Sequence, residues 1–454
     1  MLNYIWLGLV LAAVLLGGFT GRMKELADGT FESAKTAVTI ALGLVGIMAL
    51  WLGIMRLAER SGLVKIIAAC LRPLTRKLFP DVPAEHPANG AIVMTIAANM
   101  LGLSNAATPL GLRAMGHLES LNPHPGTATN AMCTFLAIST SSVQLIPATA
   151  VAILASAGSK DPTAIIGTAL IATTCAAVAG VVSVKWLEKW PVFRLSNDVM
   201  QSADAAAAFH ERHEKNVDEV RRSQTAAATE AEAAPLTFAG KLALLVFLGI
   251  FASWFVLDAF FPGAFGRPIS ASAGRSGFAR VIGTVSLMAI PFLLTLFPLY
   301  AALRRVKVYE EFVEGAKEGF NVAVRIIPFL VAILVAIGML RAAGGIDILS
   351  RWLAPVFDRV GFPTDLLPMV LVRPLSGSAT TGLFTELVKN HGPDALITRM
   401  AGTIFGSTET TFYVIAVYFG SVAVRRTRHA VLAGLTADIT GVIVSVIVCR
   451  LMFG

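Results

Sequence analysis

The sequence predicts an all-α polytopic membrane protein made of two inverted-topology repeats with broken or re-entrant helices. Three observations support this fold class: an apolar composition, an internal self-similarity and the distribution of basic residues. Of the 454 residues, 55% are hydrophobic and only 15% are charged, and the mean hydropathy is +0.71. The apolar runs reach the roughly 20 residues that a helix needs to cross a bilayer, and we expect about eight full spans. We therefore expect a multi-pass protein of the cytoplasmic (inner) membrane, with the lipid bilayer as its main partner.

The self-similarity consists of two collinear blocks. In the first block, one constant offset aligns Glu32, Ala34, Lys35, Gly62 and Pro73 with Glu314, Ala316, Lys317, Gly344 and Pro355. In the second block, a shorter offset aligns Thr129, Thr134, Ser139, Ser141, Ser142 and Ile146 with Thr398, Thr403, Thr408, Thr410, Thr411 and Ile415. Single matches of this kind arise by chance, but their common order favours a duplicated membrane unit.

The basic residues indicate that the two copies point in opposite directions. Lys and Arg collect on the cytoplasmic flanks of membrane helices. In the first copy they follow the apolar stretch 38–54, and its last helix, about 164–184, ends in Lys185 and Lys189. In the second copy they come first, because Arg304 and Arg305 precede the equivalent stretch and residues 425–428 precede the last helix. An inverted topology satisfies both ends at once.

The expected organisation is two membrane halves joined by a polar segment. The first half covers residues 1–194 and the second covers 236–454. Residues 195–235 form the only extended polar stretch, which we interpret as a cytoplasmic linker. Further helices before the copies supply the connecting crossings, and they are expected at Tyr4–Phe19, Leu242–Phe261 and Val281–Leu303.

Several function classes find no support in the residues. His210 and His213 lie in the linker without further nearby ligands, and the four cysteines are isolated, so we expect no metal site and no cofactor. The net charge of +8 is concentrated at helix ends, which argues against a nucleic-acid partner. Because no HExxH motif or Ser/His catalytic pattern is present, we do not expect an enzyme. The sequence leaves a homo-oligomer open.

Two segments are too interrupted to be ordinary spans. Residues 97–115 contain Gly102, Asn105 and Pro109, and residues 373–387 contain Pro374 and two glycines. We interpret both as re-entrant hairpins whose tips meet near the middle of the membrane, where a broken backbone is tolerated only if protein or water lines it. The alternative is a pair of tight helix–helix contacts through small residues.

Four ionisable residues lie where lipid would penalise them: Arg373, Glu386, Glu409 and Asp438. Arg373 and Glu386 could instead lie at the membrane interface, and Asp438 could form a structural hydrogen bond. Glu409 is the strongest candidate for a functional group, because the glycine and hydroxyl residues around it lower helix propensity and favour an interrupted helix.

The candidate binding site combines this carboxylate with hydroxyl, amide and guanidinium groups from both copies. It consists of Glu409, Ser407, Thr408, Thr410, Ser139, Ser141, Asn99, Asn105, Ser376, Ser378 and Arg373. Such groups donate and accept hydrogen bonds and suit a polar or anionic solute. The carboxylate could take a coupling proton, a sodium ion or a ligand N–H, and the sequence does not choose among them. We expect a permease that moves a small solute by alternating access.

The motifs also resemble a known family. The segments FESAKTAVTIALGLVGIMALWLGIMRLAE, AANMLGLSNAATPLGL and TNAMCTFLAISTSSVQLIP resemble spore maturation protein A, and VYEEFVEGAKEGF, VRPLSGSATTG and GSTETTFYVIAVYFGSV resemble spore maturation protein B. The resemblance covers nearly the whole chain except the linker. It implies a fusion of two usually separate proteins, each with a domain called nucleoside recognition or gate, at about 31–155 and 312–424.

This resemblance implies little about the substrate. The family is associated with dehydration of the spore core, and its gate domains are related to those of bacterial ferrous-iron permeases. Ser407-Thr408-Glu409 is similar to the Gln-Thr-Glu hairpin tip of concentrative nucleoside transporters, except that Ser replaces Gln. A nucleoside-like solute is therefore one expectation. The alternative is a non-transporting membrane scaffold or sensor that acts in envelope or spore-maturation-like processes through the linker.

Overall fold

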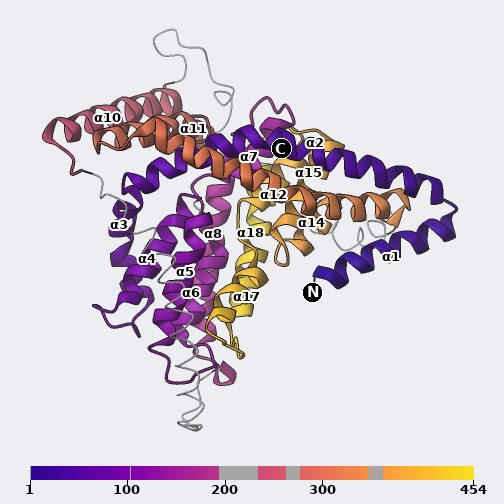
Figure 1. The fold of residues 1–454 in the computed structure, drawn as a ribbon, viewed down its shortest axis with the longest axis horizontal. Coiled ribbons are helices and arrows are strands. Elements are labelled where there is room, and N and C mark those ends of the chain that lie inside the picture. Colours follow the sequence, from indigo (N-terminus) through magenta and orange to yellow (C-terminus); the bar gives the residue numbers. More distant parts are fainter. Residues whose placement is uncertain (1, 103, 194–233, 262–276, 346–347, 349–360) are drawn as a thin grey trace.

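The structure is a computed structural model that describes residues 2–102, 104–193, 234–261, 277–345, 348 and 361–454. Figure 1 shows a helical protein, and no strand is assigned in the described ranges. The α-helices are α1 Leu2–Thr20, α2 Met23–Arg60, α3 Leu63–Leu78, α4 Pro87–Met100, α5 Ser104–Glu119, α6 Asn130–Ser141, α7 Ala148–Ser156, α8 Ile165–Leu187, α10 Phe238–Phe260, α11 Gly277–Leu303, α12 Val308–Ala342, α14 Leu367–Val372, α15 Gly377–His391, α16 Leu396–Phe405, α17 Thr411–Ser421 and α18 Ala430–Phe453. The predicted all-α class is confirmed. The predicted linker falls almost wholly outside the described residues.

Helices α8 and α18 form an antiparallel pair at the centre (Figure 1). Near the end of α8, Ser183 Oγ lies 3.4 Å from Thr436 Oγ1, near the start of α18. At the other end of the pair, the Thr403 hydroxyl lies 2.8 Å from the Thr168 hydroxyl of α8 and 3.2 Å from Cys449 Sγ of α18. Gly180 lets the two backbones approach, since a Cβ there would lie 3.3 Å from that of Ala437. The last helix of each predicted half therefore runs opposite to the other.

The long helices α2 and α12 form a second antiparallel pair, which crosses the first pair at a steep angle (Figure 1). Glycines line their contact. A Cβ on Gly53 would lie 2.7 Å from the Phe312 ring, and a Cβ on Gly319 would lie 2.5 Å from the Met48 carbonyl oxygen. At the far end of the pair, Gly29 faces Ala342. The small residues at these positions explain how two helices of 38 and 35 residues pack along most of their length.

Four helices of the described chain are long and apolar enough to span a bilayer: α8, α10, α11 and α18. Helices α10 and α11 cover the two crossings predicted before the second copy, and both are long and apolar enough to make them. Only 6% of the α10 span is buried, so its Leu, Val, Ile and Trp side chains face outward, as lipid contact requires. The expectation of about eight full spans is not met in the described residues, because other apolar segments are split into short helices such as α16 and α17.

The predicted interruptions are present. The first hairpin, α4–α5, breaks between Met100 and Ser104, and the second, α14–α15, breaks between Val372 and Gly377. The helix around Glu409 is also interrupted, because α16 ends at Phe405 and α17 begins at Thr411. A further break, between α6 and α7, lies in the first copy directly after the residues that align with the break at Glu409.

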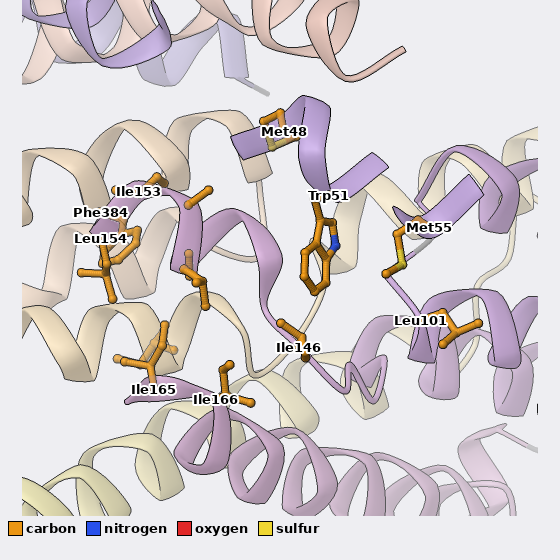
Figure 2. Packing of buried hydrophobic residues seen from close by; sticks show 14 of the residues in the cluster. Met48, Trp51, Met55, Leu101, Ile146, Ile153, Leu154, Ile165, Ile166 and Phe384 are labelled. Carbon is orange, nitrogen blue, oxygen red and sulfur yellow. The ribbon is translucent and has the colours of Figure 1, made fainter. Parts of the chain in front are cut away.

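The main hydrophobic cluster joins both halves. Figure 2 shows Met48, Trp51 and Met55 of α2 beside Leu101, at the tip of the first hairpin, and Ile146, in the break of the first copy. Ile165 and Ile166 of α8 belong to the same cluster, and so does Phe384 of α15, which comes from the second half. The tips and the breaks are therefore fixed by apolar packing that neither half supplies alone.

Candidate functional site

The candidate site lies where the two broken helices meet. The backbone N–H of Glu409 donates to the carbonyl oxygen of Thr140 at 2.7 Å. The side-chain amide of Gln144, in the break between α6 and α7, donates to Glu409 Oε1 at 2.7 Å. Each broken helix thus satisfies polar groups of the other. Glu409 is half-buried at this contact, whereas its neighbours Thr408 and Thr410 are buried.

The local sequence explains both breaks. Gly406 follows α16, and the hydroxyl residues after it compete with helical backbone hydrogen bonding. In the first copy, Ser142 leaves the helical region with φ 14° and ψ 89°, and Pro147, which cannot donate a backbone hydrogen bond, precedes α7. The result is four helix termini inside the protein, each with unpaired backbone groups that need partners.

Arg373 supplies partners for the end of α16. It is buried inside the protein, with 5% of its surface exposed. Its guanidinium donates to the Phe405 carbonyl oxygen at 3.0 Å and to the Thr410 hydroxyl at 3.1 Å, and it lies 5.2 Å from the centre of the Phe405 ring. A cation at the carboxyl end of a helix is favoured by the helix dipole.

Whereas the Arg373 cation lies at the carboxyl end of α16, Asp438 of α18 places an acidic group at the amino terminus of α17. Its Oδ2 accepts a hydrogen bond of 2.6 Å from the hydroxyl of Thr411, the first residue of α17. A carboxylate near a helix amino terminus is stabilised by the dipole. Asp438 therefore forms the structural hydrogen bond that was one of its two interpretations, and it does so within the polar region that contains Arg373 and Glu409.

The hairpin tips contact the same breaks. The N–H of Leu145, in the first break, donates to the Met100 carbonyl oxygen of the first hairpin at 3.0 Å. In the second copy, the N–H of Phe412 donates to the Pro374 carbonyl oxygen at 2.9 Å. The Ser376 hydroxyl accepts from the N–H of Ala379 at 3.2 Å and so caps α15. Both tips are therefore held against the broken helices, as the hairpin interpretation requires.

The remaining candidate residues differ in their availability. The Ser141 hydroxyl donates to the Ala137 carbonyl oxygen within α6, and the Ser407 hydroxyl, in the break, donates to the Ile404 carbonyl oxygen of α16, at 2.8 Å each. The Ser139 hydroxyl is buried and has no hydrogen-bond partner in the described part of the chain. Asn99 and Ser378 are half-buried beside the hairpin breaks. The side chain of Asn105 lies outside the described residues.

Two contributors were absent from the candidate set. Gln144 pairs with Glu409, and Thr411 pairs with Asp438. The self-alignment already carried a signal for both, since Thr411 aligns with Ser142 and Gln144 follows two residues later. Glu386 lies elsewhere, in an ion pair with Arg341. In the described residues, no three His, Cys, Asp or Glu side chains are arranged to hold a metal ion.

Comparison with known proteins gives consistent matches. The gate family, described as nucleoside recognition, matches residues 41–157 and 323–425. Spore maturation protein B of Bacillus subtilis (strain 168) is 43% identical over 175 residues, which are 38% of this chain and 98% of that protein. Spore maturation protein A of the same organism is 40% identical over 182 residues, which are 40% of this chain and 93% of that protein.

Among solved structures, the YdaH transporter of Alcanivorax borkumensis aligns over 98% of this chain and 96% of its own, with 13% identity and a TM-score of 0.38. A superposition at that score supports no structural argument. The two sequence relatives are decisive, because nearly the full length of each is matched at 40% identity or more. The chain therefore belongs to the spore maturation protein A and B family, as a fusion of both, and is a multi-pass membrane protein.

Proposed function

We propose that this protein is a permease that moves a small polar or anionic solute by alternating access, with Glu409 at the binding site. The observation that carries the proposal is the contact between Glu409 and Gln144, which joins the interruptions of two helices from different halves. Broken helices that meet inside a membrane protein expose backbone donors and acceptors at a depth where lipid offers none.

Internal symmetry supports the alternating-access mechanism. Glu409 aligns with Thr140 in the second block of the self-alignment, and these two residues are hydrogen-bonded to each other. In the α2–α12 pair, a Cβ on Gly315 would lie 2.8 Å from that of Arg56, and Gly338 faces Ser33. In the alignment of the first block, Ser33 corresponds to Gly315 and Arg56 corresponds to Gly338. The contact between Ser33 and Gly338 is therefore equivalent to the contact between Gly315 and Arg56. Inverted repeats are related by a pseudo-twofold axis, and such an axis makes equivalent helices run antiparallel to each other.

The chemistry of the site favours a solute with both donor and acceptor groups. The buried Nε of Arg373 has no hydrogen-bond partner in the described residues and can donate to an anionic or carbonyl oxygen. Glu409 can accept from a hydroxyl or N–H of the solute. These groups fit a nucleoside or a small organic anion, and the description of the gate family as nucleoside recognition makes nucleosides the first class to test.

The test is uptake of labelled nucleosides and small organic anions into proteoliposomes. Glu409→Gln keeps an acceptor for Gln144 but removes the charge, and we expect uptake to fall at least about tenfold, in the range of one lost charge-assisted hydrogen bond. Glu314→Gln is the matched control, because Glu314 is exposed and pairs with Lys317 away from the site. Uptake by Glu409→Gln equal to that of the wild type would remove Glu409 from the mechanism.

A scaffold or sensor that acts through the linker is the second candidate. Hydrogen bonds to the helical part of the protein hold both ends of the linker. Arg428 donates to the Phe193 carbonyl oxygen, and the N–H of Ala234 donates to the Arg304 carbonyl oxygen at 3.1 Å. Such anchoring would transmit a force on the linker to the core. Deletion of Ser196 to Ala234 separates the candidates, since a permease keeps its transport and a linker-dependent sensor loses its function.

We also assign residues 1–194 to the spore maturation protein A-like half and residues 236–454 to the B-like half. The motif order along the chain supports this assignment. Because the main hydrophobic cluster contains residues of both halves, they form one folding unit. The linker would then serve to keep them together rather than to shape the site.

A further inference from the structure

A half-open cavity of about 290 Å³ lies between α2, α12 and α15. Its charged lining consists of Glu32 from α2, Arg341 from α12, and Glu386 and Lys389 from α15. Gly29 and Gly338 also line it, at positions where α2 and α12 pack closely against each other. From Gly377, which faces Thr410, to Lys389 the α15 axis rises about 18 Å at 1.5 Å per residue, so the cavity is separate from Glu409.

The four charges are arranged as two ion pairs. Arg341 Nη2 lies 2.9 Å from Glu386 Oε1, and Lys389 Nζ lies 2.8 Å from Glu32 Oε1. Lys389 also donates to the Thr36 hydroxyl at 3.2 Å. The side chain of Glu386 is the most buried of the four, with 13% exposed, whereas that of Arg341 is 41% exposed. Each pair leaves further carboxylate lone pairs and N–H donors for a ligand, since a guanidinium carries five donors and a carboxylate about four acceptor sites.

The opposite end of the α2–α12 pair is built differently. There, Arg56 lies 2.9 Å from Glu311 and 3.0 Å from Glu318, and Arg60 lies 3.1 Å from Glu311. These ion pairs join α2 directly to α12. At the cavity end, the ion pairs run instead from α2 and α12 to α15. At one end of the pair, ion pairs therefore hold α2 against α12. At the other end, α2 and α12 are each paired with α15, and the cavity lies between the three helices.

Charge balance selects the class of ligand. The lining carries two cations and two carboxylates that already pair with each other, so a ligand of net charge zero keeps the site neutral. A zwitterion can bring an ammonium to Glu386 and an acid group to Arg341 and leave every charge paired. We propose that this cavity binds a small zwitterion, in which an amine and an acid group are separated by a few bonds.

Glu32 and Arg341 lie at the end of the α2–α12 pair opposite to Arg56 and Arg60. A free amino acid and the head group of a zwitterionic phospholipid share the required chemistry. The site does not depend on Glu409 or on the proposed transport.

The test uses purified full-length protein in detergent and equilibrium binding of glycine, β-alanine and γ-aminobutyrate, with propionate and propylamine as singly charged probes. We expect at least one zwitterion to bind at least tenfold more tightly than either singly charged probe. Glu386→Gln and Arg341→Gln should each weaken that binding at least tenfold. Lys317→Gln, which breaks an exposed ion pair outside the cavity, should leave it unchanged.

A second measurement tests whether the bound zwitterion is the head group of a phospholipid. Native mass spectrometry should show retention of phosphatidylethanolamine over phosphatidylglycerol, lost in Glu386→Gln, if the occupant is a head group. Because the single variants could fold poorly, the charge-exchanged double variant Arg341→Glu with Glu386→Arg is included, and it should restore binding. Equal binding of propionate and zwitterions, wild-type binding by Glu386→Gln, or no binding in either measurement would overturn the proposal.

Discussion

The two broken helices share a backbone plan but differ in charge. The first, α6–α7, carries the neutral Gln144 in its break, whereas the second, α16–α17, carries Glu409 and has Arg373 and Asp438 at its two inner ends. Both breaks are held by the tip of a hairpin through one backbone hydrogen bond. The comparison teaches that two interrupted helices can be held in the same way and still differ in their ionisable groups.

The largest expected effect comes from removing the cation of the second break. Arg373→Met leaves the Phe405 carbonyl and the Thr410 hydroxyl without their buried donor. We expect the free energy of unfolding to fall by about 3 kcal/mol or more, since hydrogen bonds to charged groups contribute about 1.5 to 3 kcal/mol each. Thermal unfolding in detergent measures the change. Arg305→Met, at the end of α11 outside the site, is the control, and equal unfolding temperatures for the two variants would contradict the account.

Charging the first break should have the next largest effect. Gln144→Glu places a second carboxylate against Glu409, where the amide now donates at 2.7 Å. Like charges at that distance repel, and the wild-type hydrogen bond is lost, so we expect a destabilisation of about 1 to 3 kcal/mol at neutral pH. The loss should shrink at low pH, because protonation of either carboxyl restores a donor. A destabilisation that does not change with pH would mean that the two side chains do not interact.

The pair of Thr411 and Asp438 gives a smaller and more specific effect. Their hydrogen bond of 2.6 Å should appear as a coupling free energy of about 1 to 2 kcal/mol in a double-mutant cycle of Thr411→Val and Asp438→Asn. Additive effects in the thermal unfolding of the two single variants and the double variant would show that Asp438 does not support the start of α17.

Sequence reasoning found the breaks but not all of their partners. Glycine, proline and hydroxyl residues at 102, 374 and 406–411 lower helix propensity locally, so both hairpins and the interruption at Glu409 could be predicted. The pairing of Gln144 with Glu409 spans 265 positions and depends on how the halves pack, which residue type does not encode. For the same reason, Glu386 was considered with Arg373, although the fold pairs it with Arg341.

The smallest expected effect concerns the chain connection. Residues 1–194 and 235–454, expressed together as two polypeptides, should co-purify and unfold as one unit, because the main cluster and the α8–α18 pair join them. Each half expressed alone should be unstable, since its side of the cluster would lack its partner. Stable and separate halves would contradict the shared core.

The inverted arrangement of the halves is the central claim, and cysteine accessibility tests it most directly. In a background without the native cysteines, Lys189→Cys and Arg425→Cys report one end of the α8–α18 pair, and Lys160→Cys and Gly454→Cys report the other. In intact cells, a membrane-impermeant thiol reagent should label only the cysteines at positions 160 and 454, and the cysteines at 189 and 425 should react only after the membrane is opened. If the cysteines at 189 and 425 instead lie on opposite sides of the membrane, the two halves are not inverted repeats.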